Sequence, residues 1–254
     1  MRRIFAFVSS LIGVMLLTSV AFAQSDMVKL IRAENYYVAG YNNGGYTERN
    51  VLIQVKNVAY DKQVHVHAER SDGVWVDVPA HFERMGNDTY ELWRTRREDF
   101  DGNYGYRQYA LKYQVSGQTY WDNNGGANYA FQSDYANGPG PRLGNDINVL
   151  LYSASHSGNF YAYVDVRNIA YTKNVAIIYT ANHWATSTTL DASFVGWYQT
   201  GYSSFIQFPN VYGVERWRVN APVSASQFEF YLAYTVNGST YYDNNYGANY
   251  SIGY

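Results

Sequence analysis

The feature that most constrains this chain is a nine-residue stretch that is written twice. Trp-Asp-Asn-Asn-Gly-Gly-Ala-Asn-Tyr at 121–129 returns as Tyr-Asp-Asn-Asn-Tyr-Gly-Ala-Asn-Tyr at 242–250, and only the first and fifth positions differ. Similar runs, 109–120 and 230–241, precede the two copies. An aromatic ring followed by amides and glycines predicts a polar loop with one flat apolar plate. This combination suits a sugar better than a charged ligand.

The repeat extends well beyond this motif. Residues 57–64 (NVAYDKQV) match 168–175 (NIAYTKNV), and Trp75 and Trp93 match Trp184 and Trp217. The copies lie 111 residues apart at Asn57 and 121 apart at Trp121, so the second copy carries about ten extra residues. Self-similarity of this kind predicts two tandem copies of one domain, 24–131 and 146–254. The boundary falls in a linker, 132–145, whose Asn-Gly-Pro-Gly-Pro run is expected to hold neither a helix nor a strand ladder.

The first 23 residues have the pattern of a secretory signal peptide. Arg2 and Arg3 precede an apolar run, and Ala21-Phe22-Ala23 forms a small-x-small cleavage site. We therefore expect cleavage before Gln24 and a secreted or periplasmic protein, with a retained membrane anchor as the less favoured alternative. Because the chain has no cysteine, it must be stabilised by its hydrophobic cores without disulfides.

Hydrophobic residues alternate with polar ones along several short segments. Val64, Val66 and Ala68 alternate with Gln63 and His65, and the runs 108–115, 175–179 and 228–236 repeat this period of two. One apolar and one polar face per strand predicts half-buried antiparallel sheets, hence an all-β protein with one β-sandwich per copy. We expect four aromatic side chains to lie in the cores: Trp93, Trp217, Tyr113 and Tyr234.

Composition and motifs exclude several classes of function. A net charge of -2 with 16% charged residues provides no electrostatic surface for nucleic acid or anionic membrane. The acidic residues that recur, Asp122/Asp243 and Glu91/Glu215, do not form an evident catalytic pair, and Asp122 is expected to bond its own backbone in a turn. His65 and His67 share a strand face but lack a third metal ligand, so a solvated face is the preferred interpretation. We predict no enzyme activity, no cofactor and no metal.

The recurring residues resemble one known family. Asn-(Val/Ile)-Ala-Tyr-x-Lys-x-Val, then a Trp, then (Trp/Tyr)-Asp-Asn-Asn-x-Gly-Ala-Asn-Tyr is similar to carbohydrate-binding module family 21, and the resemblance covers about 26–131 and 146–253. It implies two tandem immunoglobulin-like antiparallel β-sandwich domains. It also implies binding of α-1,4-glucans such as starch, amylose, glycogen and maltooligosaccharides, with two sugar sites per module.

The resemblance assigns specific residues to these sites. One site would use Trp75 and Trp121 in the first copy, and Trp184, Tyr231 and Tyr242 in the second. The other would use Asn57, Tyr60, Lys62 and Phe82, and then Asn168, Tyr171, Lys173 and Phe194. The motif asparagines Asn123, Asn128, Asn244 and Asn249 match positions that contact sugar or shape the loop.

One departure from the family pattern distinguishes the copies. Ala110 stands where the second copy has Tyr231, so the first copy lacks one ring platform, and Trp121, larger than Tyr242, is the expected compensation. We therefore expect the copies to bind the same polymer with unequal strength. The longer segment of the second copy, 186–220, is expected to reshape the rim of its site.

The sequence as a whole predicts a secreted, non-catalytic protein that binds α-glucan through two modules acting by avidity. A separate secreted amylase is a possible partner, and no stable membrane insertion is expected. Two alternatives remain open: an accessory, protein-interaction subunit of an amylolytic system, and an outer-membrane β-barrel, which the polar outward faces of the predicted strands disfavour.

Overall fold

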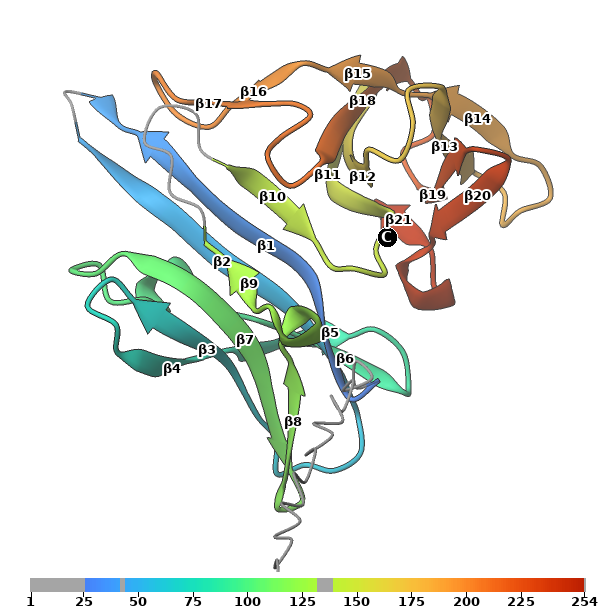
Figure 1. The fold of residues 1–254 in the computed structure, drawn as a ribbon. Coiled ribbons are helices and arrows are strands. Elements are labelled where there is room, and N and C mark those ends of the chain that lie inside the picture. The colour runs from blue at the N-terminus through green and yellow to red at the C-terminus, as the bar shows by residue number, and fades with distance from the viewer. Residues whose placement is uncertain (1–25, 42–43, 132–138, 254) are drawn as a thin grey trace, which may run out of the picture.

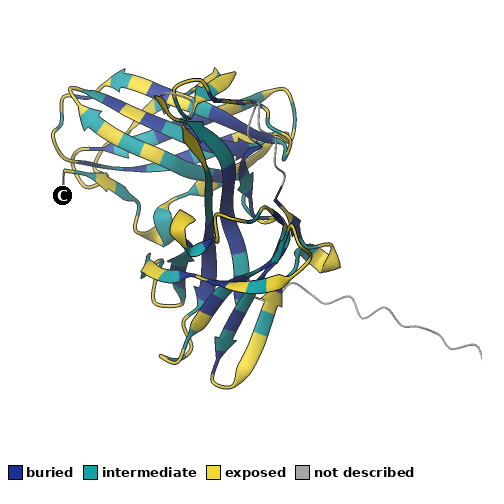
Figure 2. Ribbon diagram, turned by 90° about the vertical axis from the view of Figure 1, so that its left-hand side faces the viewer, coloured by how far each residue is buried: buried dark blue, intermediate teal, exposed yellow. Residues whose placement is uncertain are grey.

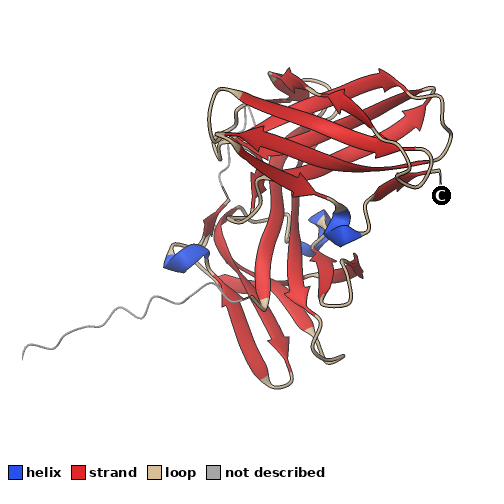
Figure 3. Cartoon of the chain, turned by 90° about the vertical axis from the view of Figure 1, so that its right-hand side faces the viewer, coloured by secondary structure: helices blue, strands red, loops and turns tan. Residues whose placement is uncertain are grey.

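The computed structural model describes residues 26–41, 44–131 and 139–253. The predicted signal peptide and residues 132–138 of the predicted linker lie outside the described residues. Strands dominate the described chain, and the helical segments within it are single 3-10 turns (Figures 1 and 3). None of the helical segments described is long and apolar enough to cross a membrane.

The first sandwich consists of two antiparallel sheets. One has the order β10-β1-β2-β6-β5, and the other the order β4-β3-β7-β8 with β9 also paired to β7. The strands are β1 (Val28–Ala39), β2 (Gly45–Lys56), β3 (Gln63–Arg70), β4 (Trp75–Pro79), β5 (His81–Met85), β6 (Tyr90–Arg94), β7 (Tyr106–Val115), β8 (Gln118–Asp122), β9 (Tyr129–Ala130) and β10 (Gly140–Leu143).

The second sandwich repeats this arrangement. Its sheets have the orders β11-β12-β18-β15 and β14-β13-β19-β20, with β21 paired to β19, and β16-β17 form a separate hairpin. The strands are β11 (Val149–Ser157), β12 (Asn159–Arg167), β13 (Lys173–Thr180), β14 (Thr188–Asp191), β15 (Ser193–Val195), β16 (Trp197–Gln199), β17 (Phe205–Gln207), β18 (Val214–Pro222), β19 (Phe228–Val236), β20 (Ser239–Asp243) and β21 (Tyr250–Ile252). The prediction of an all-β fold with a β-sandwich in each copy is confirmed.

The alternating pattern determines which side chains form each core. Val64, Val66 and Ala68 are buried between the sheets of the first sandwich, whereas the residues between them face outward. Tyr113 and Tyr234 are fully buried, and each hydroxyl donates to a backbone carbonyl 2.7 Å away, at Lys56 and Arg167. Both are core residues, as predicted. Trp93 and Trp217 are half-buried and pack against the two cores. Figure 2 shows buried residues concentrated on the strands and exposed residues on the loops.

The expectation that the Asn-Gly-Pro-Gly-Pro run holds no ladder is wrong at its end. Gly140–Leu143 forms β10, which pairs antiparallel with β1 from Arg32↔Leu143 to Asn35↔Gly140. Pro141 is accommodated because β10 lies at the edge of its sheet, where a missing N–H need not face another strand. The segment that follows the first copy therefore belongs partly to the first sandwich.

The extra residues of the second copy form an element that contacts the first sandwich. The hairpin β16–β17 lies beside the end of the β1–β2 hairpin at which β1 ends and β2 begins (Figure 1). The backbone N–H of Tyr202 donates to the carbonyl of Ala39 at 2.8 Å, and the hydroxyl of Thr200 donates to the carbonyl of Tyr37 at 2.9 Å. The insertion thus docks the two sandwiches, instead of reshaping the rim of the sugar site as the sequence suggested.

A second contact between the two sandwiches is formed by hydrophobic side chains. Ile31, Leu52 and Leu92, on the outer face of the first sandwich, form a hydrophobic cluster with Ile147, Leu150 and Tyr246 of the second. The sandwiches consequently meet through an apolar patch as well as through backbone hydrogen bonds.

Candidate functional site

Three aromatic rings lie side by side on the surface of the second sandwich. The Trp184 ring lies 5.3 Å from that of Tyr231 at 33°, and the Tyr231 ring lies 6.0 Å from that of Tyr242 at 64°. With Asn244 and Asn249 they line an open hollow of about 350 Å³. The structure therefore brings together every residue predicted for this site, and we call the three rings the second ring site.

Each ring of this site is held from a different element. Tyr231 projects from β19 and Tyr242 from β20, which are neighbouring strands. Trp184 lies in the turn after β13 with a φ of +65°, a left-handed conformation that is uncommon for a bulky residue. Its indole N–H donates to Glu229 at 2.8 Å, and its backbone N–H donates to Thr180 at 3.0 Å. These two bonds fix the ring beside Tyr231.

The first sandwich has the corresponding site, which includes one ring that was not among the residues predicted for it. Trp75 and Trp121 are 37% and 41% exposed, as expected of binding platforms. Between them lies His67, whose ring stacks on Trp75 (4.9 Å, 19°) and meets Trp121 edge-on (5.4 Å, 76°). Trp75, His67 and Trp121 form the first ring site.

Strand register is the signal that would have identified His67 as a residue of the ring site. The sequence comparison matched Ala110 to Tyr231 and left His67 as a solvated residue of a strand face. In the structure His67 is the cross-strand partner of Ala110, as Ile178 is of Tyr231. The sequence does not give the register between β3 and β7. The role of His67 in the ring site was therefore missed.

Charged groups surround His67 on its outer face. Its Nδ1 lies 2.6 Å from the carboxylate of Asp77, which also accepts from the ammonium of Lys112 at 2.7 Å. Partial burial acts to raise the pKa of Asp77, but the hydrogen bonds from Lys112 and His67 outweigh it and the pKa is lowered. The carboxylate is thus held ionised beside the ring. Burial also lowers the pKa of His65 on the same strand.

The repeated Asp-Asn-Asn motif builds the turn beside each ring site. Asn123 and Asn244 cap short 3-10 turns, Asn124–Gly126 and Asn245–Gly247, because each side-chain oxygen accepts from a backbone N–H 3.0 Å away, at Gly126 and Gly247. Asn128 and Asn249 close the turns in the left-handed region, at φ of +56° and +57°, which asparagine tolerates well.

The aspartate of the motif is structural. Asp122 is buried and accepts from the backbone N–H of Asn124, as predicted for a turn residue. It also accepts from the N–H of Leu30 at 2.9 Å and from the hydroxyl of Tyr129 at 2.8 Å. Asp243 repeats all three contacts with Asn245, Leu151 and Tyr250. The motif therefore fixes the turn to the first strand of its own sandwich.

The second predicted site of each copy presents an exposed tyrosine and an exposed phenylalanine. Tyr60 and Tyr171 are 104% and 99% exposed, and Phe82 and Phe194 are 52% and 45% exposed. Phe82 and Phe194 occupy the same register, opposite Trp93 and Trp217, with each pair edge-on. Asn57 and Asn168 are exposed beside the two tyrosine loops. The match between Phe82 and Phe194, which loop lengths obscured in the sequence, is therefore sound.

The side chains of the two lysines that the resemblance assigns to this site lie inside the sandwich. Neither Lys62 nor Lys173 is a solvated side chain: they are 5% and 2% exposed, and each ammonium pairs with a glutamate, Glu91 at 3.0 Å and Glu215 at 2.8 Å. The same glutamates accept from the indole N–H groups of Trp93 and Trp217. Each lysine thus pairs with the glutamate that holds the indole against which Phe82 or Phe194 packs.

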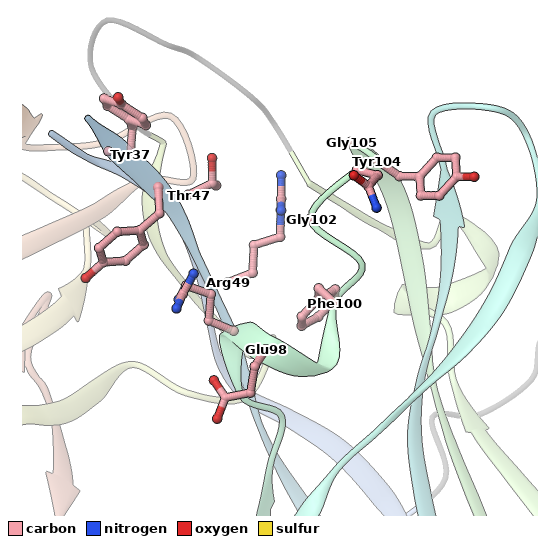
Figure 4. A pocket seen from close by; sticks show the side chains of 12 residues that line it. Tyr37, Thr47, Arg49, Glu98, Phe100, Gly102, Tyr104 and Gly105 are labelled. Atoms are coloured by element: carbon pink, nitrogen blue, oxygen red, sulfur yellow. The ribbon is translucent and has the colours of Figure 1, made fainter. Parts of the chain in front are cut away.

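A further hollow lies apart from both predicted sites. It has a volume of about 530 Å³ and opens between the β1–β2 hairpin and the loop 97–105. Figure 4 shows Tyr37, Thr47 and Arg49 on the hairpin side and Glu98 and Phe100 on the loop side. None of the residues predicted to bind sugar lines it.

The family assignment follows from comparison with known proteins. The model of the carbohydrate/starch-binding module (family 21) matches residues 47–132 and 145–253. The chain belongs to this family. Each family match contains one complete ring site and its asparagine turn, so the two copies are two modules of the same kind.

Similar proteins include enzymes and regulatory subunits. Glucoamylase 1 of Rhizopus oryzae is 37% identical over 108 residues, 41% of this chain and 16% of that protein. Protein phosphatase 1 regulatory subunit 3B of Danio rerio is 30% identical over 111 residues, 44% of this chain and 36% of that protein. The chain thus spans only a minor part of either relative.

Among solved structures, the starch-binding domain of Rhizopus oryzae glucoamylase in complex with β-cyclodextrin and maltoheptaose is 32% identical. The match covers 42% of this chain and 94% of that one, with a TM-score of 0.33. A circularly permuted family 21 module is 28% identical over 46% of this chain and 97% of its own, with a TM-score of 0.29.

Proposed function

We propose that this protein is an exported, non-catalytic binder of α-1,4-glucan that uses both modules on one polymer. The observation that carries the proposal is the second ring site, in which Trp184, Tyr231 and Tyr242 lie at angles of 33° and 64° beside Asn244 and Asn249. A pyranose presents C–H groups on its faces and hydroxyls around its edge. Aromatic rings cover the faces, and amide groups bond the edge.

The angles between the rings favour a curved polymer. An α-1,4-glucan bends along its length, whereas cellulose is flat and suits rings in one plane. The edge-on rings of the first ring site, at 76°, have the same bent arrangement. Starch, amylose, glycogen and maltooligosaccharides are accordingly the proposed ligands.

Avidity between the modules depends on their docking. A single exposed sugar site is weak, because ordered water is displaced for each hydrogen bond gained. Linked sites raise the affinity for a polymer only when the geometry lets both engage. The hydrophobic cluster and the β16–β17 hairpin hold the sandwiches together, so the spacing of the sites is set by the fold and not by a flexible linker.

A second candidate function is an accessory subunit that contacts another protein, such as a secreted amylase. The observation that favours it is an aromatic pair on the inserted hairpin, where Trp197 is 62% exposed and packs edge-on against Phe205 at 5.3 Å. This pair lies outside both predicted sugar sites. Replacing Trp197 with alanine should leave glucan binding unchanged if the pair serves a protein contact, and a purified amylase should then lose its affinity for the variant.

Affinity electrophoresis against a panel of polysaccharides tests the proposed function. The protein should be retarded by amylose and glycogen and should migrate freely in a gel containing a soluble cellulose derivative. Free migration in every α-glucan gel would overturn the proposal. Export is tested separately, by finding the mature chain outside the cytoplasm with Gln24 as its first residue.

A further inference from the structure

The two ring sites have the same geometry built from different residues. In the second, a central ring, Tyr231, lies 5.3 Å from Trp184 and 6.0 Å from Tyr242. In the first, the central ring is His67, at 4.9 Å from Trp75 and 5.4 Å from Trp121. Each central ring is inclined less to one neighbour (33° for Tyr231 and 19° for His67) than to the other (64° and 76°).

Strand register explains how a histidine takes the place of a tyrosine. Residues directly opposite each other on antiparallel strands have Cβ atoms about 5 Å apart on the same face. His67 is opposite Ala110, and Ile178 is opposite Tyr231. The aromatic residue thus lies on β3 in the first module and on β19, the counterpart of β7, in the second, and the residue opposite it is aliphatic in both, Ala110 and Ile178. The ring consequently remains between its two aromatic neighbours.

The exposure of the central ring fits a binding role. The side chain of His67 is 32% exposed, and Tyr231 is also half-buried. Its Nδ1 is engaged by Asp77, which leaves Nε2 as the edge of the ring available to a sugar hydroxyl.

We propose that His67 is the third sugar-binding ring of the first module, and that it makes glucan binding by this module, but not by the second, depend on pH. The inference rests on the proposed function, because it concerns the residues with which a ring site holds α-glucan. Histidine changes its charge between about pH 5 and 8, and the corresponding tyrosine does not.

The sign of the pH effect follows from desolvation. A sugar that covers His67 removes water from the imidazole, which disfavours its charged form. Sugar binding and protonation of His67 therefore oppose each other, so protonation weakens binding. The affinity of the first module should fall as the pH falls.

The charged groups around His67 define its environment. The carboxylate of Asp77 on β4 lies 2.6 Å from the Nδ1 of His67, and the ammonium of Lys112 on β7 lies 2.7 Å from the same carboxylate. On β3 itself, His65 also titrates, and Glu69 is paired with Arg107 at 3.8 Å. Because His65 could contribute its own pH dependence, the test must change His67 alone while His65 is kept.

The test uses the full chain with the second ring site removed by Trp184→Ala and Tyr231→Ala, and with the exposed tyrosines of the other predicted sites replaced by Tyr60→Ala and Tyr171→Ala. Maltoheptaose is titrated into this background by calorimetry at pH 8.0 and pH 5.0. His67→Ala should lower the affinity at pH 8.0 by about tenfold, and the reference variant Trp75→Ala should lower it by about 30-fold. With His67 present, the affinity should fall by up to about tenfold at pH 5.0, because sugar binding and protonation oppose each other at this ring.

Two further variants separate the ring from its charge. His67→Phe keeps a ring without a titrating group and should bind at both pH values. His67→Ile with Ala110→Tyr transfers the arrangement of the second module and should behave in the same way. Circular dichroism confirms that each variant is folded.

The outcomes distinguish the inference from the proposed function. If the unmodified chain does not bind maltoheptaose or amylose, the proposed function itself fails. If Trp75→Ala weakens binding in the background but His67→Ala leaves it unchanged, the role of His67 is overturned while the proposed function stands. If His67→Phe retains the full pH dependence, the titrating group is not His67.

Discussion

The hydroxyl of Tyr246 donates to Oε1 of Gln54 over 2.7 Å, and this bond joins the second sandwich to the first. Tyr246 has a φ of +61°, and the matching residue of the first copy is Gly125 with a φ of +68°. The left-handed conformation costs a side-chain-bearing residue about 1–2 kcal/mol. The tyrosine is retained there because its ring packs on Gly86 and on the cluster around Leu52 and Leu92.

Replacing Tyr246 with glycine should loosen the docking of the two sandwiches. The substitution relieves the backbone but removes a buried ring, worth about 2–3 kcal/mol, and a hydrogen bond, worth about 1 kcal/mol. A net loss of about 2 kcal/mol is expected. It should appear as a lower melting temperature and a larger radius of gyration in small-angle X-ray scattering. Tyr246→Phe is the matched control, because it loses only the hydrogen bond; an unchanged radius for the glycine variant would contradict the interpretation.

The double variant Trp75→Ala with Trp184→Ala should remove most α-glucan binding and leave the fold intact. Both rings lie at the surface, so their loss costs little core packing. An aromatic side chain at the centre of a binding surface contributes about 2 kcal/mol or more, which corresponds to an affinity loss of about 30-fold at each site. Retardation in amylose gels measures the effect. Normal retardation of a folded double variant would assign the binding to other residues.

Lys173→Met should affect stability more than sugar binding. The substitution leaves Glu215, itself 10% exposed, without the ammonium that now lies 2.8 Å away. Removing one partner of a buried ion pair typically costs about 3–5 kcal/mol. Thermal unfolding should therefore occur at a clearly lower temperature, and Glu215→Gln together with Lys173→Met should recover part of the loss. A variant of unchanged stability that binds glucan poorly would instead make Lys173 a direct sugar contact.

Asp77→Asn should change how stability depends on pH. The pKa of Asp77 is lowered in the folded protein, so its contribution is fully present above the unfolded value of 3.8 and is lost as the pH falls through the folded value. The difference in free energy of unfolding between the wild type and the variant should shrink as the pH falls below 3.8. Urea denaturation at several pH values measures it. A difference that grows towards low pH would reverse the sign of the assigned shift.

Much of the fold was predictable because local patterns agree with it. Period-two segments such as 63–69 and 108–115 became β3 and β7, and the repeated motif became the same 3-10 turn in both copies. Two of the three rings in the first ring site, and all three in the second, followed from matching the copies and from the resemblance to the family. These features depend on residues close in sequence, or on comparing the two copies within the chain.

The remaining features depend on pairings between distant residues. β10 is a strand because its backbone meets the free edge of β1, and its own sequence, with Gly140 and Pro141, disfavours one. His67 joins a ring site because of its partner on β7. The role of the inserted segment was likewise hidden, since its contacts are with Tyr37 and Ala39, more than 160 residues away. Register and docking are properties of the assembled sheets.

The two copies contribute different docking elements, so the order of the copies along the chain matters for their docking. The glycine that accepts the Tyr246 ring and the strand edge that accepts β10 belong to the first copy, whereas Tyr246 and the β16–β17 hairpin belong to the second. A gene in which the two halves are exchanged would keep every sugar-facing ring. Its product would lack complementary docking surfaces, and its two sandwiches would move independently of each other.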